Sequence, residues 1–333
     1  MLTRGGFLQA AGSAVLAQAL PPGDADPATT PGSPALRVLL GSGDAQPAGY
    51  GFLYNGQPYR GTFSRDAQGR VVNTVGVEEY LYSVVPHEMS PGWPASALEA
   101  QAICARTYVL QRSDPRRPYD LVPSELDQVY KGVAGELPGG KTAVDATAGQ
   151  VLKYRDRFAS VAYSSCCGGH TEASSDAWGS TPVPYLGGVP CTACTASPNY
   201  RWNATLTLSS IAERLPDQAA AVGNVRGLRI TALDPSGRAR AFELDGDRGT
   251  SQIKGSTFRI AVGTRNLRSL LITDLRVQPA GDAQAEPSVL IEGGGLGHGV
   301  GMCQWGARGM ALAGAYARDV LMLYFPGTEI SND

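Results

Sequence analysis

The fold is decided by residues 72–110, VNTVGVEEYLYSVVPHEMSPGWPASALEAQAICARTYVL. Residues 86–94 hold three prolines in nine positions, and because each proline ring restricts one φ angle, we expect a stiff loop there. Pro94 suits a first helical position, and apolar residues then recur at three- and four-residue spacing. They are Leu98, Ala102, Ala105 and Val109. The pattern predicts a helix over residues 95–112, packed closely through its alanines.

Short apolar runs broken by Gly, Asn and Asp precede this stretch at the spacing of successive β-hairpins. The runs are residues 36–40, 49–54, 59–63 and 71–74. Later strand patterns occupy residues 150–153, 158–164, 228–232, 240–244, 271–277 and 288–292, and helical patterns occupy residues 208–215 and 304–323. The 42 Gly and 23 Pro supply many turns. We therefore predict an α+β fold, β-rich and mixed with a few helices, with a ligand-binding cleft between the sheet region and the helices.

Composition limits the class of protein. A chain of 333 residues with 43% hydrophobic and 17% charged residues can bury a sizeable core, as one large domain or two closely associated ones. The formal net charge is -2 and no Lys/Arg-rich run occurs. Because nucleic-acid binding rests on clustered cationic contacts to phosphate, nucleic acid is a poor candidate ligand.

The N-terminal segment reads as an export signal. Residues 1–19 carry one cation, Arg4, then a short apolar stretch, with small residues Ala17 and Ala19 before the expected cleavage point. Residues 20–35 contain five prolines and predict a disordered linker, which leaves residues 36–333 as the folded domain. The alternative for residues 1–19 is a short N-terminal helix of that domain. Elsewhere no run approaches the roughly 18 apolar residues that span a bilayer, so we expect no transmembrane anchor.

The three histidines all lie in loops marked by glycine, proline or cysteine. His87 precedes Glu88, His170 follows the run Cys-Cys-Gly-Gly, and His298 lies within the glycine-rich residues 293–301. A core-packing role would place histidines on apolar faces of helices or strands. Their shared placement favours a functional role, with a structural role in each loop as the alternative.

Three blocks in order along the chain carry a family resemblance. They are residues 72–110, then YSSCCGGHTEASSDAWG (163–179) with VPYLGGV (183–189), and finally GGGLGHGVGMCQWGARGMALAGAYARDVLMLYFPGTEI (293–330). Together they resemble the SpoIID/LytB family, stage II sporulation protein D and its relatives. The match covers most of residues 72–330, so it is more specific than any single motif. It implies that residues 36–333 form a catalytic domain whose cleft binds glycan.

The resemblance implies an exported enzyme of the periplasm, cell envelope or extracellular space that cleaves peptidoglycan glycan strands, with Glu88 as the catalytic acid. The residues agree with this role, since a carboxyl that protonates a glycosidic oxygen near neutral pH needs a raised pKa, which burial near apolar groups supplies. The nearby apolar residues are Val84, Val85, Met89 and Trp93. Capping of the helix over residues 95–112 is the alternative role for Glu88.

A second catalytic carboxylate is not obvious in the three blocks. Ordinary glycosidases use two. A lytic transglycosylase needs one, because the C6 hydroxyl of muramic acid attacks C1 of the same sugar and gives a 1,6-anhydro end. Glu99, Asp114 and Asp176 are candidates for a second carboxylate, which keeps simple hydrolysis as an alternative.

Five further residues are candidate substrate-binding residues: Gln101, Arg106, His298, Gln304 and Trp305. Gln101 and Arg106 follow Glu88 on the predicted helix, although a surface salt bridge between Glu99 and Arg106 is an equal alternative. The six glycines around His298 allow a close approach of backbone to a ligand. An amide at Gln304 and an aromatic ring at Trp305 form a pairing that suits sugars, with simple packing as the alternative.

The cysteines predict a metal site. Cys167-x-x-His170 followed by Cys191-x-x-Cys194 has the paired spacing of a tetrahedral zinc site, and some members of the resembled family carry a metal in this region. Four protein ligands leave no open position, so the zinc would be structural. Disulfides are the alternative for an exported protein. Cys166 is the substitute ligand if the register is shifted, and Cys104 and Cys303 are expected to be small buried residues.

Two other functions stay open. The family includes members thought to stimulate a separate cell-wall amidase, so the protein could bind glycan strands without cutting them. The other alternative is a thiol or zinc hydrolase that uses Cys303 and His298, or that uses the candidate zinc as a catalytic metal.

Overall fold

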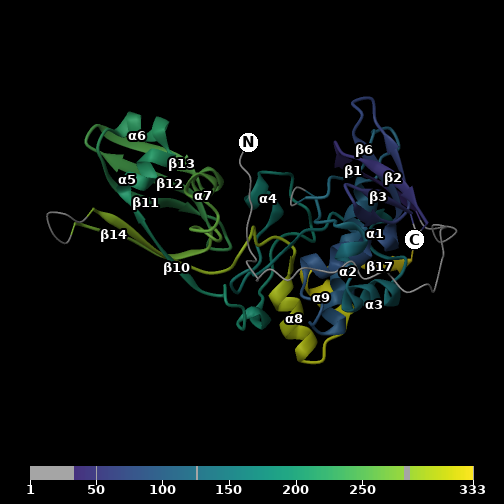
Figure 1. Cartoon of the computed structure of the whole chain (residues 1–333). Coiled ribbons are helices and arrows are strands. Elements are labelled where there is room, and N and C mark those ends of the chain that lie inside the picture. The colour runs from purple at the N-terminus through teal and green to yellow at the C-terminus, as the bar shows by residue number, and fades with distance from the viewer. Residues whose placement is uncertain (1–33, 50, 125–126, 281–285, 333) are drawn as a thin grey trace.

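The computed structural model describes residues 34–49, 51–124, 127–280 and 286–332. The predicted export signal, residues 1–19, lies outside the described residues, and so does the predicted linker up to its last two positions. Figure 1 shows a larger body that contains both ends of the described chain and, beside it, a smaller lobe built by residues 202–293. Helices and small sheets contribute to both, which confirms the α+β class.

Two antiparallel three-stranded sheets precede the first helix. Their orders are β1-β6-β5 and β2-β3-β4, with β1 Ala35–Gly41, β2 Ala45–Ala48, β3 Gly51–Tyr54, β4 Gln57–Tyr59, β5 Thr62–Arg65 and β6 Val71–Gly76. Asn55 and Gly56 connect β3 to β4 with φ angles of 48° and 77°. These two residue types tolerate the positive φ angles that a two-residue hairpin turn requires. The predicted hairpin region is therefore present.

Three helices follow, α1 (Val77–Glu88), α2 (Ala95–Arg112) and α3 (Pro138–Ala146). The bounds of α2 are those that the sequence predicts. The predicted stiff loop begins later than expected, because Pro86 lies in the last turn of α1. A proline there removes one helical hydrogen bond, and its buried ring packs so close to Gly140 that a Cβ at that position would lie 2.6 Å away. Glu88 is thus carried by a packed helix.

The main hydrophobic core lies between these helices, the N-terminal sheets and the C-terminal segment. Ala97, Ala100, Ala102 and Ala105 of α2 are fully buried, which lets neighbouring elements approach α2 closely. Strand β7 (Gln150–Tyr154) pairs with β8 (Arg157–Phe158) and with β17 (Glu329–Asn332) from the end of the chain. The C-terminal segment therefore belongs to the larger body.

A parallel pairing brings two of the family-like blocks together. Strand β9 (Tyr163–Ser164) pairs with β16 (Met302–Cys303), so Tyr163 lies opposite Met302 and Ser164 opposite Cys303. Helix α4 (Ser174–Trp178) follows β9, and helix α8 (Gln304–Leu312) follows β16. Two loops of distant sequence thus share one site.

The single helix predicted over residues 304–323 is wrong. The structure has two helices, α8 and α9 (Ala317–Tyr324), separated by a short turn. Gly314 in this turn has a φ angle of 92°, which a continuous helix cannot accommodate. The apolar periodicity runs on across the break and hides it.

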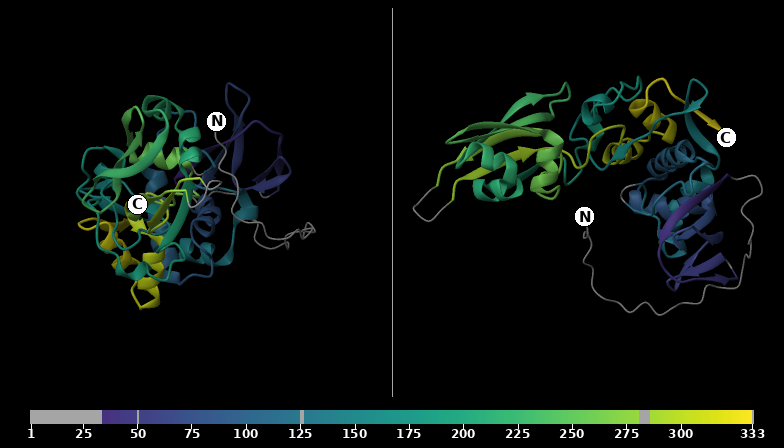
Figure 2. Two further views of the ribbon diagram at one scale, coloured as in Figure 1. Left: turned by 90° about the vertical axis from the view of Figure 1, so that its left-hand side faces the viewer. Right: turned by 90° about the horizontal axis from the view of Figure 1, so that it is seen from above.

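The smaller lobe has its own hydrophobic core, with Phe242 and Phe258 stacked at a ring-centroid distance of 4.3 Å. Its two sheets have the orders β10-β15-β14 and β11-β12-β13. Its elements are β10 Trp202–Thr207, α5 Leu208–Arg214, α6 Pro216–Val222, β11 Val225–Leu233, β12 Ala239–Gly246, β13 Gly249–Lys254, α7 Gly255–Val262, β14 Ile272–Gln278 and β15 Ser288–Gly293. The right-hand view of Figure 2 shows the same separation of the lobe from the larger body.

A buried ion pair joins the lobe to the larger body. Arg238, which directly precedes β12, lies with its Nε 3.4 Å from a carboxylate oxygen of Glu172, and both side chains are almost fully buried. The guanidinium also donates to the carbonyls of Cys167 at 2.8 Å and His170 at 3.0 Å. Separately, none of the helices among the described residues combines the length and the apolar character needed to cross a membrane.

Candidate functional site

Glu88 ends α1 and is half-buried. The last turn before it is held in place by two contacts of Ser83. Its hydroxyl accepts a hydrogen bond from the backbone N–H of Lys131 at 3.0 Å, and its carbonyl accepts one from Nδ1 of His87 at 2.7 Å. Burial lowers the pKa of His87, so this imidazole is neutral at neutral pH. The backbone that carries Glu88 is therefore fixed.

Three tyrosines lie near the Glu88 carboxyl: Tyr80 from α1, Tyr108 from α2 and Tyr163 from β9. Together with Glu88 we call them the Glu88 group. Burial raises the pKa of Tyr80 and Tyr163 well above the ordinary value, and the negative charge of Glu88 raises both further. Burial, with smaller effects of Asp127 and Glu88, raises the pKa of Tyr108 to about 12. All three phenols therefore stay protonated at neutral pH and can donate hydrogen bonds.

Buried polar atoms beside these tyrosines lack partners. Gln128, fully buried, donates from Nε2 to the hydroxyl of Tyr163 at 3.0 Å. Its Oε1 and the hydroxyl of Tyr80 have no hydrogen-bond partner among the described residues. Buried polar groups are nearly always hydrogen-bonded, so such atoms next to a carboxyl are suited to bind a ligand. Neither residue was a candidate in the sequence analysis.

Gln101 and Gln304, both candidate substrate-binding residues, meet in the structure. Nε2 of Gln304 donates to Oε1 of Gln101 at 3.3 Å, and both side chains are buried. The Nε2 of Gln101 has no partner among the described residues. Gln101 and Tyr108 lie seven residues apart on one face of α2, about 10 Å along its axis. The glutamine pair and the Glu88 group thus line the same helix face.

Trp305, the aromatic candidate, forms a platform with a residue of the proline-rich loop. Its ring centroid lies 5.1 Å from that of Trp93, with the ring planes at 66°. The guanidinium of Arg308 lies over both rings, at 5.1 Å from Trp305 and 5.7 Å from Trp93. The half-buried platform joins the loop after Glu88 to α8.

Arg106 has a different position from the one that spacing suggested. It is almost fully buried, and its ion-pair partner is Glu78 of α1 at 2.6 Å. Further donors reach the carbonyls of Gln150 at 3.0 Å and Val144 at 3.3 Å. These contacts occupy its guanidinium, so Arg106 holds α1 against α2.

His298 lies between the Glu88 group and α4. Its Nδ1 accepts from the backbone N–H of Val300 at 3.0 Å, and the ring also hydrogen-bonds to the backbone of Tyr163. Loss of solvation lowers the pKa of His298 to about 4. The imidazole is neutral with both nitrogens occupied, so what it offers a neighbour is its ring face. Trp178 of α4 packs against it, with the centroids 5.3 Å apart.

Four buried cysteines form a cluster, which we call the cysteine cluster: Cys167, Cys191, Cys194 and Cys303. Their sulfur atoms all lie within 4.8 Å of one another. Three were candidate ligands in the sequence. The fourth differs: Cys303 occupies the place expected for His170, whose Nδ1 instead lies 2.6 Å from the carbonyl of Thr171. The pairing of β9 with β16 carries Cys303 into the cluster.

Backbone and hydroxyl groups surround the sulfur atoms. Sγ of Cys303 accepts from the N–H of Cys167 at 3.2 Å and of Gly306 at 3.3 Å, at the start of α8. Sγ of Cys191 lies 3.0 Å from the hydroxyl of Tyr324. Such contacts orient the sulfur atoms, although burial raises the pKa of the Cys303 thiol.

The cluster fits a tetrahedral metal. With Zn–S bonds of about 2.3 Å, sulfur atoms at tetrahedral corners lie about 3.8 Å apart. Cys167 and Cys194 have that separation, 3.8 Å. Hydrogen bonds from Cys166 and Cys167 lower the pKa of Cys194 to about 4, and one from Cys167 lowers the pKa of Cys191. The same hydrogen bonds with Cys191 and Cys194 raise the pKa of Cys167. Soft thiolates at this spacing are the ligands that zinc prefers.

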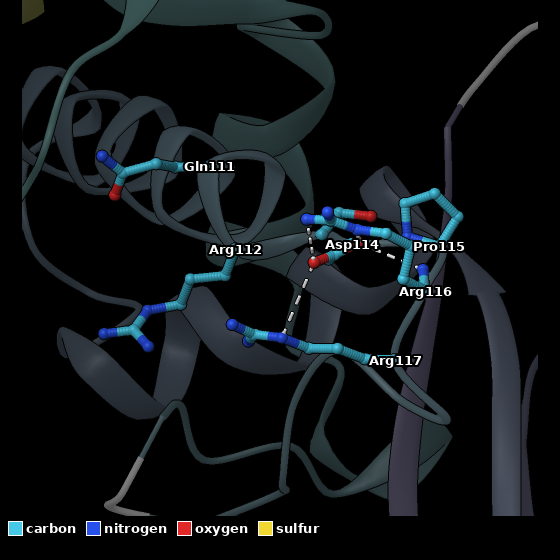
Figure 3. A pocket seen from close by; sticks show the side chains of 7 residues that line it. Gln111, Arg112, Asp114, Pro115, Arg116 and Arg117 are labelled. Carbon is cyan, nitrogen blue, oxygen red and sulfur yellow. Dashed lines mark hydrogen bonds and ion pairs between the residues drawn. The ribbon is translucent and has the colours of Figure 1, made fainter.

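The candidate second carboxylates lie in other settings. Asp114 lines an open cavity of about 550 Å³ formed by residues 111–117, and Figure 3 shows its ion pairs with Arg116 and Arg117. Glu88 does not line this cavity. Asp176 pairs with Arg240 at 3.2 Å. Both carboxylates are engaged by arginines.

Several site residues escaped the sequence analysis: Tyr80, Tyr108, Gln128, Tyr163, Trp178 and Arg308. All of these except Gln128 stand inside a family-like block, so the blocks themselves were a signal for them. Gln128 stands between blocks, and only the tertiary fold brings it to Glu88.

Comparison with known proteins agrees with the three blocks. Residues 65–154 match the family described as Stage II sporulation protein, and residues 192–301, which include the smaller lobe, match a domain of unknown function. An uncharacterized protein of Brachyspira hyodysenteriae is 33% identical over 84% of this chain and 74% of its own length. The Stage II sporulation protein D of Bacillus amyloliquefaciens is 28% identical over 78% of this chain and 75% of its own length.

The Amidase enhancer of Bacillus subtilis is 30% identical over 76% of this chain, and the match covers 40% of that longer relative. Matched segments thus span both the larger body and the smaller lobe. The chain belongs to the SpoIID/LytB family of cell-wall proteins.

Proposed function

We propose that the protein cleaves the glycan strands of peptidoglycan by lytic transglycosylation, with Glu88 as the acid and base. The observation that supports this most is the placement of the fixed Glu88 carboxyl beside buried phenols and unpartnered polar atoms. Phenols that stay protonated can hold sugar oxygens without competing for the catalytic proton.

The reaction needs only one carboxyl. Glu88 gives its proton to the glycosidic oxygen as the bond from that oxygen to C1 of the muramic acid breaks. The C6 hydroxyl of the same sugar then forms a bond to C1, and its proton returns to Glu88. No water is consumed, and the carboxyl ends in its starting state. The protein's part is to bind the strand, place Glu88 at the bond and exclude water.

Zinc is the proposed metal of the cysteine cluster, in a structural role. Four thiolates close the coordination shell, so what zinc supplies is a cross-link between the loop of Cys167, the loop of Cys191 and Cys194, and the start of α8. Trp305 and Gln304 follow Cys303 directly. The cross-link would therefore keep the aromatic platform and the glutamine pair in position.

A second function is supported by one relative. The match to a protein named Amidase enhancer favours a wall-binding protein that stimulates a separate amidase. A simple hydrolase is the third reading. We propose export to the cell envelope in each case, because peptidoglycan lies there.

Mass spectrometry of muropeptides separates the three functions. Purified sacculi are digested with the protein alone and with an added amidase. Transglycosylation gives 1,6-anhydromuramic ends, hydrolysis gives free reducing muramic ends, and amidase stimulation gives released peptides only when the amidase is present. We expect anhydro ends from the protein alone; either of the other two patterns would reject the proposal.

A further inference from the structure

Trp178 is an exposed tryptophan whose ring is supported by a neighbouring side chain. It ends α4, and 53% of its surface is accessible. Its ring packs against His298 at 5.3 Å with the planes at 56°. The next residue, Gly179, ends the helix in the left-handed region with a φ angle of 67°. The ring is thus supported from one side and open to solvent on another.

The support under Trp178 is rigid. Both nitrogens of His298 are engaged by backbone groups, those of Val300 and Tyr163. Its loop has little freedom, because a side chain at Gly299 would collide with the buried guanidinium of Arg238. An exposed aromatic ring that stands on a fixed support loses little conformational freedom when a ligand stacks on it.

A polar pair has one member, Asp176, close to Trp178 in the chain. Asp176, on the same short helix, pairs with Arg240 of β12 at 3.2 Å, and the side chain of Arg240 is 53% exposed. A carboxylate accepts hydrogen bonds from hydroxyls, and a guanidinium donates to hydroxyl or acetamido oxygens. An aromatic surface with a few oriented polar groups is the usual composition of a small-ligand site. Here the polar groups come from both bodies of the molecule.

The position relative to Glu88 is defined by β9. Trp178 packs on His298, His298 binds the backbone of Tyr163, and the Tyr163 hydroxyl lies in the group around Glu88. A chain of contacts through β9 therefore connects Trp178 to the residues around Glu88. A polymer cut at Glu88 extends beyond the cleaved bond, so it has sugars available for a second contact.

We propose that Trp178, supported by His298 and close in the chain to Asp176 of the Asp176–Arg240 ion pair, is a distal binding site for an amino-sugar ring of the glycan strand. The choice of strand as occupant rests on the proposed function. The distal site would set a minimum substrate length, because a short oligosaccharide that fills the Glu88 group does not reach Trp178. A protein partner seated on the same tryptophan is the competing occupant.

Binding is measured in a Glu88→Gln background, so that cleavage does not interfere. The probes are a β-1,4-linked N-acetylglucosamine dimer and hexamer, and purified peptide-free glycan strands, titrated by calorimetry. Trp178→Ala is compared with Trp178→Phe, which keeps an aromatic ring. Tyr316→Ala is the matched control, because Tyr316 is 75% exposed and lies at the start of α9. Circular dichroism checks that each variant is folded.

We expect Trp178→Ala to weaken binding of the hexamer and the strands about tenfold, with the dimer unchanged. Trp178→Phe should restore most of the affinity, and Tyr316→Ala should have no effect. Equal binding of the hexamer by Trp178→Ala and its parent would overturn the proposal. So would a loss of amidase binding in Trp178→Ala with unchanged strand binding.

The proposed function can fail separately. If the wild-type protein makes no anhydro ends but still binds strands through Trp178, the catalytic assignment is rejected and the distal site stands. If anhydro ends appear and Trp178→Ala leaves strand binding unchanged, the distal site is rejected and the catalytic assignment stands.

Discussion

The guanidinium of Arg106 lies 2.6 Å from the carboxylate of Glu78, and this ion pair joins α2 to the first turn of α1. The Glu78 carboxylate also accepts a hydrogen bond from the N–H of Gly149 at 3.1 Å. Arg106 has 1% of its side chain exposed and Glu78 has 18%. The helix that carries Glu88 is thus anchored by a largely desolvated charge pair.

Arg106→Met should therefore destabilise the fold. The substitution leaves the Glu78 carboxylate without its partner, and the loss of a buried partner typically costs about 3–5 kcal/mol in the free energy of unfolding. Urea unfolding measures it. Arg116→Met is the matched control, because Arg116 pairs with Asp114 on the surface and should change stability little. Equal effects of the two substitutions would contradict the anchoring role.

The cysteine cluster predicts which residues hold zinc. Cys303→Ala removes one of the four clustered sulfurs, so we expect loss of bound zinc and a lower melting temperature. His170→Ala should keep the zinc, because His170 lies outside the cluster. Elemental analysis of protein purified without chelator gives the stoichiometry, expected at about one per chain.

The opposite pattern, with zinc lost in His170→Ala and kept in Cys303→Ala, would restore the ligand set that sequence spacing favoured. Protein without metal whose cysteines resist alkylation until reduced would instead support disulfides.

His298 predicts a pH dependence of stability. Its pKa is lowered to about 4 in the folded protein by loss of solvation, whereas an unfolded chain has the ordinary value of about 6.5. Below pH 6.5 the unfolded chain binds a proton that the folded protein does not take up until about pH 4. The stabilising contribution is therefore complete above pH 6.5 and is lost as the pH falls toward 4, by at most about 3 kcal/mol.

The test compares wild type with His298→Gln, in which this titration is absent. Urea unfolding at pH 7, 5.5 and 4 should show the stability difference between the two proteins shrinking as the pH falls. A difference that stays constant over this range would show that His298 is not held neutral by the fold.

How much the sequence could predict depends on the range of the interactions involved. The bounds of α2 follow from local periodicity and the proline before it, so they were predictable. The break between α8 and α9 was missed, because one glycine interrupts a helix without interrupting the apolar pattern. Strand positions in the smaller lobe were largely predictable, but its separate hydrophobic core was not visible in local patterns.

The candidate site shows the same limit. Cys167, Cys191 and Cys194 could be grouped by spacing, whereas Cys303 joins them only through the parallel pairing of β16 with β9. Gln101 and Gln304 were each candidates, yet their contact arises from the packing of α8 on α2. The burial of Arg106 could not be seen, because its partner Glu78 stands 28 positions earlier on another helix.

Glu88→Gln tests the central claim most directly. The substitution keeps the size of the side chain and removes its ionisable proton, so the protein should fold and still sediment with peptidoglycan. Glu99→Gln, which changes a carboxyl on the neighbouring helix α2, is the matched control. We measure the rate at which 1,6-anhydromuramic ends form from purified glycan strands. The account predicts a fall of at least about 10² to 10⁴ for Glu88→Gln and little change for Glu99→Gln; equal rates for Glu88→Gln and wild type would contradict it.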